Sequence, residues 1–524
     1  MILGTSSHVG KSIITAGLGR IFSDAGVRVA PFKAQNMSLN SAATPDGGEI
    51  GRAQALQAEA CRVAPCVEMN PVLIKPRSDS TSQIVVMGKI WGQISARDYH
   101  NQRVEEIFPA VLESYRKLAS RYELILLEGA GSPAEINLRD HDIVNLRMAR
   151  AANAVCILVG DIDRGGVFAS LLGTIELLEP DERELIKGFV INKFRGDKAL
   201  LQPGIEMMEH RLGIPCVGIV PHLKDLNLDE EDGVTMNERK NTTQAWSKPS
   251  PESSQRKLRV GVLAFPHLAN FTDFDALASE PSVSLVFLEQ PENIPLTDVL
   301  ILPGTKQTID DLNWLEAKGF IPYIAEHRAK KKLMMGICGG FQMLGLSIHD
   351  PSGTENNGMS IERKGLAMLG VKTVFATDKT TRLVKGCLHS EFSAESQWPS
   401  CSFKGYEIHI GETVRNAGVR PFAEVIRSAD ALSVPDGAVS EDGRIFGTYV
   451  HGFFDEDPFR HGFVNVARAL AGLVPAKQHS WATLEKEARL DRLGDHLRES
   501  LNLERVCIWI GWNSEIMKTL KSVI

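Results

Sequence analysis

Residues 336–345 constrain the fold of this chain most, because they place a cysteine between glycines directly after an apolar run. The run Leu333–Met335 favours a buried strand, and the spacing Gly-x-Cys-x-Gly is typical of a sharp turn from a strand into a helix. Gly336 and Gly340 are expected to keep the approach to the Cys338 sulfur open. A helix that begins after Cys338 points backbone N–H groups at it, which favours a thiolate and later an oxyanion. The pattern predicts a nucleophile that attacks an acyl carbon.

A base for this cysteine is expected in the same half of the chain. His451 follows the apolar run 444–450, and a histidine at a strand end can reach a nucleophile and take its proton. Gly304 follows the apolar run 299–302, in a loop that either supplies N–H groups to an oxyanion or forms a plain tight turn. Gly339, directly after the cysteine, is the second expected N–H donor.

The first half of the chain carries a glycine-rich loop, residues 4–12 (Gly-Thr-Ser-Ser-His-Val-Gly-Lys-Ser), ahead of a helical pattern. Backbone N–H groups of such a loop cradle phosphates, while the lysine charge and the serine hydroxyl serve the phosphates and Mg²⁺. The alternative is a glycine turn with an exposed lysine. The first glycine sits one position earlier than in Gly-x₄-Gly-Lys-Ser, and this form resembles dethiobiotin synthetase. The residues expected to bind ATP here are Gly4, Thr5, Gly10, Lys11 and Ser12.

Acidic residues at the ends of two further predicted strands are candidate Mg²⁺ ligands. Glu128 follows the run 124–127, and Asp161 and Asp163 follow the run 155–159. Carboxylates at the carboxyl ends of parallel strands face the crevice in which such sheets bind ligands. The alternatives are that Glu128 caps its own loop and that one of the aspartates pairs with Arg164 to order the turn.

Three polar groups are candidates for contacts with nucleotide or substrate. Asn192 and Lys193 follow the run 188–191 and are expected to meet a nucleotide base, or else to begin the next helix. The other two groups are Lys33, Gln35 and Asn36 after the run 27–32, and Asn137, Asp140, His141, Asp142 and Asn145 after the Glu128 loop.

Short apolar runs alternate with helical segments in both halves, which predicts an α/β protein with two parallel-sheet domains. The expected division is an ATP-binding domain over 1–235, a Ser- and Pro-rich linker over 236–257, a second domain over 258–505 and a tail over 506–524 of unassigned role. Only two residues separate Met1 from Gly4, whereas a strand normally needs about five. A start upstream of Met1 and a weakened sheet edge are therefore expected.

Composition excludes several function classes. A net charge of −7 gives no reason to expect nucleic acid or an anionic membrane as a partner, and no apolar run is long enough to span a bilayer. The eight cysteines show no CxxC pair and no zinc-like spacing, and no signal peptide precedes the glycine-rich loop. A cytoplasmic protein is expected, and self-association into a homo-oligomer is compatible with the sequence.

Taken together, these motifs resemble the cobyric acid synthases over residues 2 to about 505. The resemblance also rests on the runs 159–168, 192–197, 270–275 (Asn-Phe-Thr-Asp-Phe-Asp), 302–308 and 405–409 (Gly-Tyr-Glu-Ile-His). It implies a P-loop domain of the dethiobiotin synthetase type followed by a class I glutamine amidotransferase-like, flavodoxin-like domain. It also implies a glutamine-hydrolysing carbon–nitrogen ligase that uses ATP and Mg²⁺ to amidate the b, d, e and g carboxylates of adenosylcobyrinic acid a,c-diamide.

The same resemblance implies site residues: Cys338 as the glutaminase nucleophile, His451 as its base, and Tyr406, Glu407 and His409 near the glutamine pocket. Triad-type glutaminases often carry a glutamate two residues after the histidine, but this chain has Phe453 there. A Cys–His dyad is therefore expected, and what orients His451 stays open.

Two alternatives remain. One is a related ligase, either the one that amidates only the a and c carboxylates or one that acts on a different polycarboxylate. The other is a nucleotide-binding regulatory protein with an inactive glutaminase module. The run Asp161–Gly166 favours the cobyric acid synthases over the first. The retained Cys338 and His451 argue against the second, as does Ser6 at the position of the signature lysine of partitioning ATPases.

Overall fold

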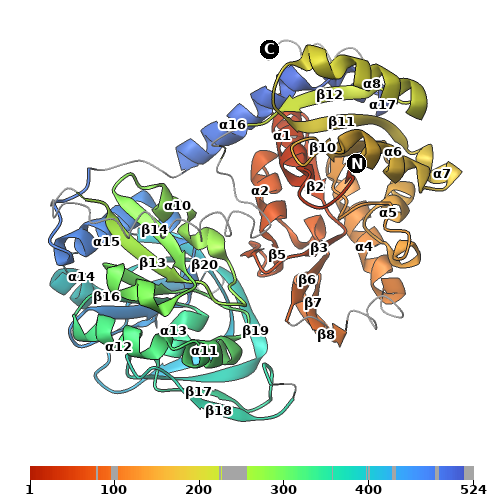
Figure 1. Cartoon of the computed structure of the whole chain (residues 1–524). Helices are drawn as coiled ribbons and strands as arrows, with labels where there is room; N and C mark the ends of the chain where they lie inside the picture. The colour runs from red at the N-terminus through yellow and green to blue at the C-terminus, as the bar shows by residue number, and fades with distance from the viewer. Residues whose placement is uncertain are drawn as a thin grey trace. The chain divides into compact units, whose positions relative to one another are not determined.

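A computed structural model of the 524-residue chain describes residues 1–77, 81–95, 104–223, 226, 256–356, 358–396, 398, 402–427, 432–477 and 483–512. The chain forms two compact units, both drawn in Figure 1. The first comprises the described parts of Met1–Ser38, Glu49–Asp229 and Lys486–Ile524, and the second those of Leu39–Gly48 and Glu230–Glu485. The predicted linker, 236–257, lies outside the described residues except for its last two positions.

A parallel sheet forms the centre of the first unit, as the alternating apolar runs predict. Strands β1, β10, β11 and β12 pair in parallel in that order, β2 pairs in parallel with β9, and a bridge between Ile2 and Glu128 connects β9 to β1. The strands are β1 (Ile2–Gly4), β2 (Val29–Phe32), β9 (Leu124–Leu127), β10 (Cys156–Asp161), β11 (Ile186–Phe194) and β12 (Cys216–Pro221).

Helices cover both faces of this sheet, because successive strand residues point to opposite sides and are apolar on both. Val159 of β10 packs toward α1, α2, α16 and α17, whereas its neighbour Leu158 packs toward α5, α6 and α8. The helices are α1 (Lys11–Asp24), α2 (Arg52–Ala60), α5 (Leu146–Ala151), α6 (Val167–Glu176), α8 (Lys198–Leu212), α16 (Thr483–Ser500) and α17 (Leu503–Trp509).

The first strand is short but lies inside the sheet rather than at its edge. β1 has three residues, all buried, with β10 on one side and the Glu128 end of β9 on the other. The expectation of a weakened sheet edge was wrong, because neighbours on both sides satisfy the backbone of this short strand.

A smaller sheet, β3-β6-β7-β8, also belongs to the first unit. It joins a parallel pair, β3 and β6, to antiparallel hairpin strands, and α4 (Val104–Ala119) shares an apolar cluster with it. Its strands are β3 (Gln35–Met37), β6 (Val72–Pro76), β7 (Thr81–Val86) and β8 (Lys89–Ser95).

The second unit contains a sheet of order β14-β13-β15-β16-β24-β23, parallel except for β23. Counted along the chain, its parallel strands have the order 2-1-3-4-5, which is the flavodoxin-like arrangement that the family resemblance implies. The strands are β13 (Leu258–Leu263), β14 (Val283–Leu288), β15 (Val299–Leu302), β16 (Leu333–Ile337), β23 (Ala438–Val439) and β24 (Ile445–Thr448).

A second sheet in this unit has the order β18-β17-β19-β20-β25, with β21 paired to β19 and β22 paired to β21. The single strand expected over 444–450 is split, because β24 ends at Thr448 and β25 (Val450–His451) pairs instead with β20 (Ser402–Arg415). The other strands are β17 (Ser347–Asp350), β18 (Ile361–Lys364), β19 (Val371–Leu388), β21 (Ala423–Arg427) and β22 (Ser433–Asp436). Helices of the unit include α10 (Asp275–Ser279), α11 (Thr308–Ala317), α12 (Phe320–Ala329), α13 (Gly339–Leu344), α14 (Ser390–Ser396) and α15 (Asp457–Leu470).

The expected domain boundary at residue 505 differs from the structure, which assigns the described residues from 486 to 512 to the first unit. Leu490, Leu493 and Leu497 form an apolar stripe on α16 that is buried in the core beside α1. Gly17 of α1 makes room for it, since a Cβ there would lie 2.4 Å from a methyl group of Leu497. The described start of the expected tail, α17, adds buried Cys507 to the same core.

Among the described residues, no helix combines the length and the apolar character needed to cross a lipid bilayer.

The burial of α16 yields a stability prediction. Leu493→Ala removes a side chain that is 1% exposed and should lower the free energy of unfolding of the first unit by about 2–5 kcal/mol. The measurement is denaturant unfolding, with Glu499→Ala on the exposed face of α16 as control. Equal stability of the two variants would contradict the placement of α16.

Candidate active site

Cys338 lies on a sharp turn between β16 and α13, as its glycine spacing predicts. Its backbone has a φ of 51° and a ψ of −108°, which residues with a side chain rarely adopt. A Cβ at Gly340 would lie 2.0 Å from the carbonyl oxygen of Leu302, and a Cβ at Gly336 would lie 2.7 Å from the backbone of Gly340. These glycines thus permit close packing of helix against strands, rather than serving mainly to open the approach to the sulfur.

His451 forms a buried pair with Asp273, a residue that the sequence analysis did not single out. The imidazole Nδ1 lies 2.6 Å from Oδ2 of Asp273, and the two side chains are about equally buried. Asp273 belongs to the short 3₁₀ helix η5 (Phe271–Phe274), which stands 178 residues before the histidine. Its Oδ1 accepts the backbone N–H of Gly452 at 3.1 Å, so the carboxylate is fixed from two sides.

This pair determines the charge of the imidazole. Burial disfavours the charged ring, but the Asp273 carboxylate and Cys338 favour it more, so the pKa of His451 is raised from 6.5 to about 10. The ring is therefore protonated at neutral pH, with Nδ1–H donated to Asp273. The Cys338 thiol, which interacts with this ring, donates to the carbonyl oxygen of Ile408 at 3.6 Å. The arrangement can stabilise a thiolate by charge and can deliver a proton to a leaving group.

The strand β20 contributes three of the predicted residues, on different sides. The Tyr406 ring stacks on His451 with centroids 5.3 Å apart, and its hydroxyl lies 3.5 Å from Asp273. Glu407 points elsewhere, toward Arg382 and Arg427 at 3.4 and 3.3 Å, because adjacent strand residues face opposite sides. The structure therefore does not bring the Glu407 carboxylate to the His451 ring.

His409 is neutral and buried near this cluster. Its Nδ1 donates to the carbonyl of Gly411 at 2.8 Å, and its ring stacks on Tyr449 with centroids 3.9 Å apart. Burial, with a smaller contribution from the positive charge of His451, lowers the pKa of His409 to about 3. Its Nε2 is buried without a hydrogen-bond partner among the described residues, so an acceptor is left for a ligand.

The loop with Gly304 meets both the histidine and the cysteine turn. A Cβ at Gly304 would lie 2.9 Å from Cε1 of His451, and a Cβ at Gly339 would lie 2.6 Å from the Thr305 methyl group. Only glycines fit this approach, which places both predicted N–H donors beside the Cys338–His451 pair.

In the first unit, the glycine-rich loop connects β1 to α1, at the carboxyl end of the strand. Gly10 has a φ of 103°, which favours glycine, and a Cβ at Gly4 would lie 2.7 Å from Val9 and 3.0 Å from Lys11. Lys11 is buried, and its Nζ donates to the carbonyls of Ser6 at 2.9 Å and Gly131 at 3.0 Å. Thr5 is tied to β10 through its N–H, which donates to Val159 at 3.0 Å.

Glu128 is the centre of the polar contacts next to this loop. Its Oε1 accepts from the Ser12 hydroxyl at 2.7 Å and from Lys33 Nζ at 3.0 Å, and its Oε2 accepts from Gln57 at 2.5 Å. Burial alone would raise the pKa of Glu128, but Lys33 and these hydrogen bonds outweigh it and hold the pKa below its ordinary value. A buried carboxylate thus stands beside the serine hydroxyl, as the strand-end argument predicts.

Asn192 and Lys193, which were predicted to meet a nucleotide base, instead donate hydrogen bonds to the glycine-rich loop. Asn192 donates to the carbonyl of Val9 at 2.8 Å, and Lys193 donates to that of His8 at 2.7 Å. Lys193 also forms an ion pair with Asp161 at 2.9 Å. The structure therefore directs Asn192 and Lys193 to loop carbonyls, and it pairs Asp161 with Lys193 and, at 3.8 Å, with Arg164. Asp163 pairs with Arg195 at 3.1 Å.

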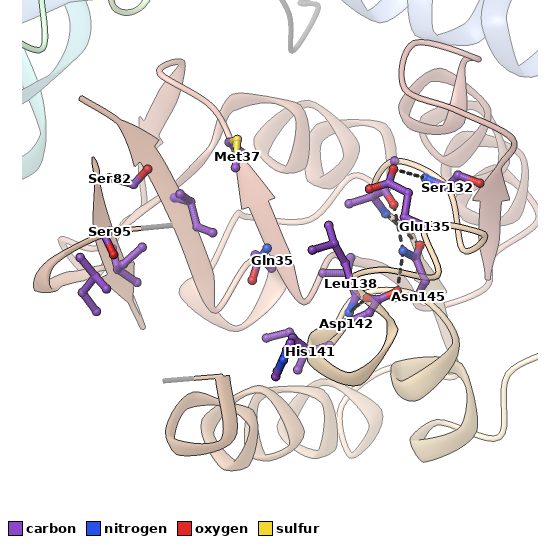
Figure 2. A pocket seen from close by; sticks show the side chains of 17 residues that line it. Gln35, Met37, Ser82, Ser95, Ser132, Glu135, Leu138, His141, Asp142 and Asn145 are labelled. Carbon is purple, nitrogen blue, oxygen red and sulfur yellow. Dashed lines mark hydrogen bonds between the residues drawn. The ribbon is translucent and has the colours of Figure 1, made fainter. Parts of the chain in front are cut away.

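An open pocket with a volume of about 210 Å³ lies next to the phosphate loop, and Figure 2 shows it. Ile74, Ile84 and Ile94 from the smaller sheet form an apolar side, and Gly131, whose carbonyl receives Lys11, belongs to the rim.

Four of the polar residues predicted to touch a substrate belong to the lining of this pocket, namely Gln35, His141, Asp142 and Asn145, whereas Asn137 and Asp140 do not. The Asn145 side chain connects two of the lining loops by hydrogen bonds. It accepts the N–H of Ala130 and donates to the carbonyl of Ala130 and to the carboxylate of Asp142. Asn36 is buried instead against Gln54, and Lys33 pairs with Glu128.

Comparison with known proteins agrees with the two units. Residues 1–236 match the family model of the CobQ/CobB/MinD/ParA nucleotide binding domain, and residues 259–459 match that of the CobB/CobQ-like glutamine amidotransferase domain.

Full-length relatives share this arrangement. The chain is 45% identical to the cobyric acid synthase of Klebsiella pneumoniae (strain 342), over 97% of both proteins. It is 43% identical to that of Dehalococcoides mccartyi (strain CBDB1), over 97% of both, and 43% identical to that of Moorella thermoacetica (strain ATCC 39073 / JCM 9320), over 99% of this chain and 98% of the relative. The chain therefore belongs to the cobyric acid synthase family and is a glutamine-dependent, amide-forming ligase.

Proposed function

We propose that the chain uses ATP and Mg²⁺ to amidate the b, d, e and g carboxylates of adenosylcobyrinic acid a,c-diamide, giving adenosylcobyric acid. The observation that carries this proposal is the buried Cys338–His451–Asp273 set in one unit, together with the Lys11 loop in the other. The first suits the release of ammonia from glutamine, and the second suits activation of a carboxylate by ATP. The names of the full-length relatives supply the corrin substrate.

The glutaminase half-reaction follows from the geometry of the second unit. The Cys338 thiolate attacks the side-chain amide carbon of glutamine, and the N–H groups of Gly304 and Gly339 stabilise the oxyanion. Protonated His451 gives its proton to the departing ammonia, which leaves a thioester on Cys338. The neutral ring then removes a proton from water, which hydrolyses the thioester and frees glutamate. Asp273 acts through His451, by fixing its tautomer and orientation, as a positioning residue.

Tyr406 and His409 are proposed to line the glutamine pocket. The ring of Tyr406 supports the imidazole, while the unpartnered Nε2 of His409 can accept a hydrogen bond from a substrate N–H. For Glu407, its pairing with two arginines favours a structural role over contact with glutamine.

The first unit is proposed to make an acyl phosphate. A carboxylate is a poor electrophile, and transfer of the γ-phosphoryl group gives it a leaving group that ammonia can displace. The N–H groups of the loop from Gly4 to Ser12 bind the phosphates, and Lys11 stabilises the charge on the transferring group. For this role Lys11 exchanges its present carbonyl partners for phosphate oxygens.

The residues present fit a magnesium ion. Ser12 and Glu128 offer a hydroxyl and a buried carboxylate 2.7 Å apart, and Mg²⁺ prefers a few such oxygens together with phosphates and water. These two residues would hold the ion, with Asp161, at the end of β10, as the further acid. When bound, the ion supplies positive charge to the phosphate oxygens.

The pocket beside Gly131 is proposed to hold the acceptor. Its isoleucine side suits an apolar macrocycle, and its polar rim suits amide and carboxylate groups. Because Gly131 contacts Lys11, an acceptor carboxylate on this rim lies near the transferring phosphoryl group.

Replacing the nucleophile separates the two half-reactions. Cys338→Ala should abolish glutamine-driven amidation but retain amidation with added ammonium salts, because only ammonia release needs the thiol. The measurement is product mass with each nitrogen source, and Cys387→Ala, at a partly exposed thiol, is the control. Loss of both activities in a folded variant would refute the two-site scheme.

Replacing Asp273 tests the electrostatics of the histidine. Asp273→Asn removes the charge that raises the pKa of His451, so this pKa falls and the alkaline limb of the glutaminase profile moves to lower pH. We also expect kcat/KM to fall by roughly 10²–10⁴-fold, because an amide no longer fixes the tautomer. The measurement is glutamate release as a function of pH, with exposed Asp442→Asn as control. An unchanged profile would show that the carboxylate does not act on His451.

Replacing the loop lysine tests the synthetase half. Lys11→Ala should eliminate amidation from both nitrogen sources and leave basal glutamate release, because Lys11 serves only the phosphates. Parallel assays of glutamate and of product mass measure this, with exposed Lys198→Ala as control. Full amidation by Lys11→Ala would contradict the proposed role of this loop in activating the carboxylate.

A further inference from the structure

A short segment from the N-terminal half of the sequence, Leu39–Gly48, is part of the second unit. It begins only six residues after Lys33, which contacts Glu128 beside the phosphate loop. The chain therefore leaves the first unit, contributes this segment to the glutaminase unit, and returns to the first unit at Glu49.

The segment is connected to the turn that carries Asp273 by two reciprocal hydrogen bonds. The N–H of Phe271 donates to Oδ1 of Asn40 at 3.1 Å, and the N–H of Ser41 donates to Oδ1 of Asn270 at 3.0 Å. Asn40 and Asn270 are both buried. Phe271 is the first residue of η5, so Asn40 satisfies an N–H at the start of the turn that ends beside His451.

The position of Asn270 shows why this turn needs an external support. Its backbone has a φ of 53° and a ψ of 46°, the left-handed region, which costs free energy for residues with a side chain and which asparagine tolerates best. The bond from Ser41 holds the asparagine side chain, and the bond to Asn40 holds the next peptide group. Together they fix the direction in which η5 presents Asp273.

The same segment also supports the other two members of the set. Ala43, in β4 (Ser41–Ala43), forms a buried apolar cluster with Tyr406 and Ile408. The Tyr406 ring stacks on His451, and the Ile408 carbonyl accepts from the Cys338 thiol. One segment thus contacts the immediate supports of the nucleophile, the base and the acid.

From these contacts we infer that residues 39–48 are a positioning element of the glutaminase site, and that Asn40 is the residue through which they set the Asp273–His451 pair. The inference rests on the proposed glutaminase reaction and adds to it a contribution from the N-terminal half of the chain. Asn40 contacts no reacting atom in this account; it acts through Asp273.

The principal test is Asn40→Leu in the full chain, which keeps the side-chain size but removes the acceptor for Phe271. We expect kcat for glutamate release to fall roughly 10- to 100-fold with little change in KM for glutamine, because misplacing a supporting group affects the reaction more than binding. The alkaline limb of the pH profile should move to lower pH, in the same direction as in Asp273→Asn. Asn40→Asp retains an oxygen acceptor and should restore most of kcat.

Two further variants separate positioning from general destabilisation. Asn270→Gly suits the left-handed backbone and removes only the side chain held by Ser41, so it should lower kcat while the fold is kept. Asn465→Leu is the control, because Asn465 lies in α15 of the same unit and its side chain likewise accepts a backbone N–H, that of Ala476, at 2.8 Å. The control should lose stability without a change in the pH profile.

These measurements distinguish a failure of the inference about residues 39–48 from a failure of the proposed glutaminase function. Folded Asn40→Leu and Asn270→Gly proteins with wild-type kcat and pH profile would overturn the inference, as would an equal loss of kcat in Asn465→Leu. Ammonium-driven amidation should persist in every variant. A wild-type chain that releases no glutamate would instead overturn the proposed function.

Discussion

The buried pair of Asp273 and His451 is the interaction on which the rest of the glutaminase site depends. Burial penalises the charged forms of both groups, and it is offset only because the two lie 2.6 Å apart and the carboxylate takes a further N–H from Gly452. A pair of this kind must be held rigidly, since separation would leave a buried charge without compensation. The asparagine bonds at the start of η5 and the Tyr406 ring provide that rigidity.

Local sequence patterns were sufficient to predict most of the groups that are proposed to carry the chemistry. Cys338 stands in a turn between a strand and a helix, and Lys11 and Ser12 begin the helix that follows a similar turn, where glycine spacing indicates the backbone geometry directly. Glu128 and His451 could be found because they end apolar runs. The roles assigned to these residues remain predictions, whereas their placement next to the expected partners is visible in the structure.

Contacts between distant segments could not be predicted in the same way. Asp273 contacts a histidine that lies 178 residues further along the chain. In the sequence, Asp273 is one acidic residue within the run 270–275, and no strand that ends directly before it marks it as a site residue. The same limit explains the domain boundaries. Leu490 and Leu493 form an ordinary apolar stripe on a helix, and such a stripe does not indicate in which hydrophobic core the helix is buried. The segment 39–48 has no sequence pattern that distinguishes it from the residues on either side.

The central claim, that the chain transfers glutamine nitrogen to corrin carboxylates, is tested most directly by isotope labelling. The full chain is incubated with adenosylcobyrinic acid a,c-diamide, ATP, Mg²⁺ and ¹⁵N-amide glutamine, and the corrin product is analysed by mass spectrometry. We expect a product that carries four new ¹⁵N amides and forms only when ATP is present. A corrin recovered without ¹⁵N, while glutamine is hydrolysed, would contradict this claim.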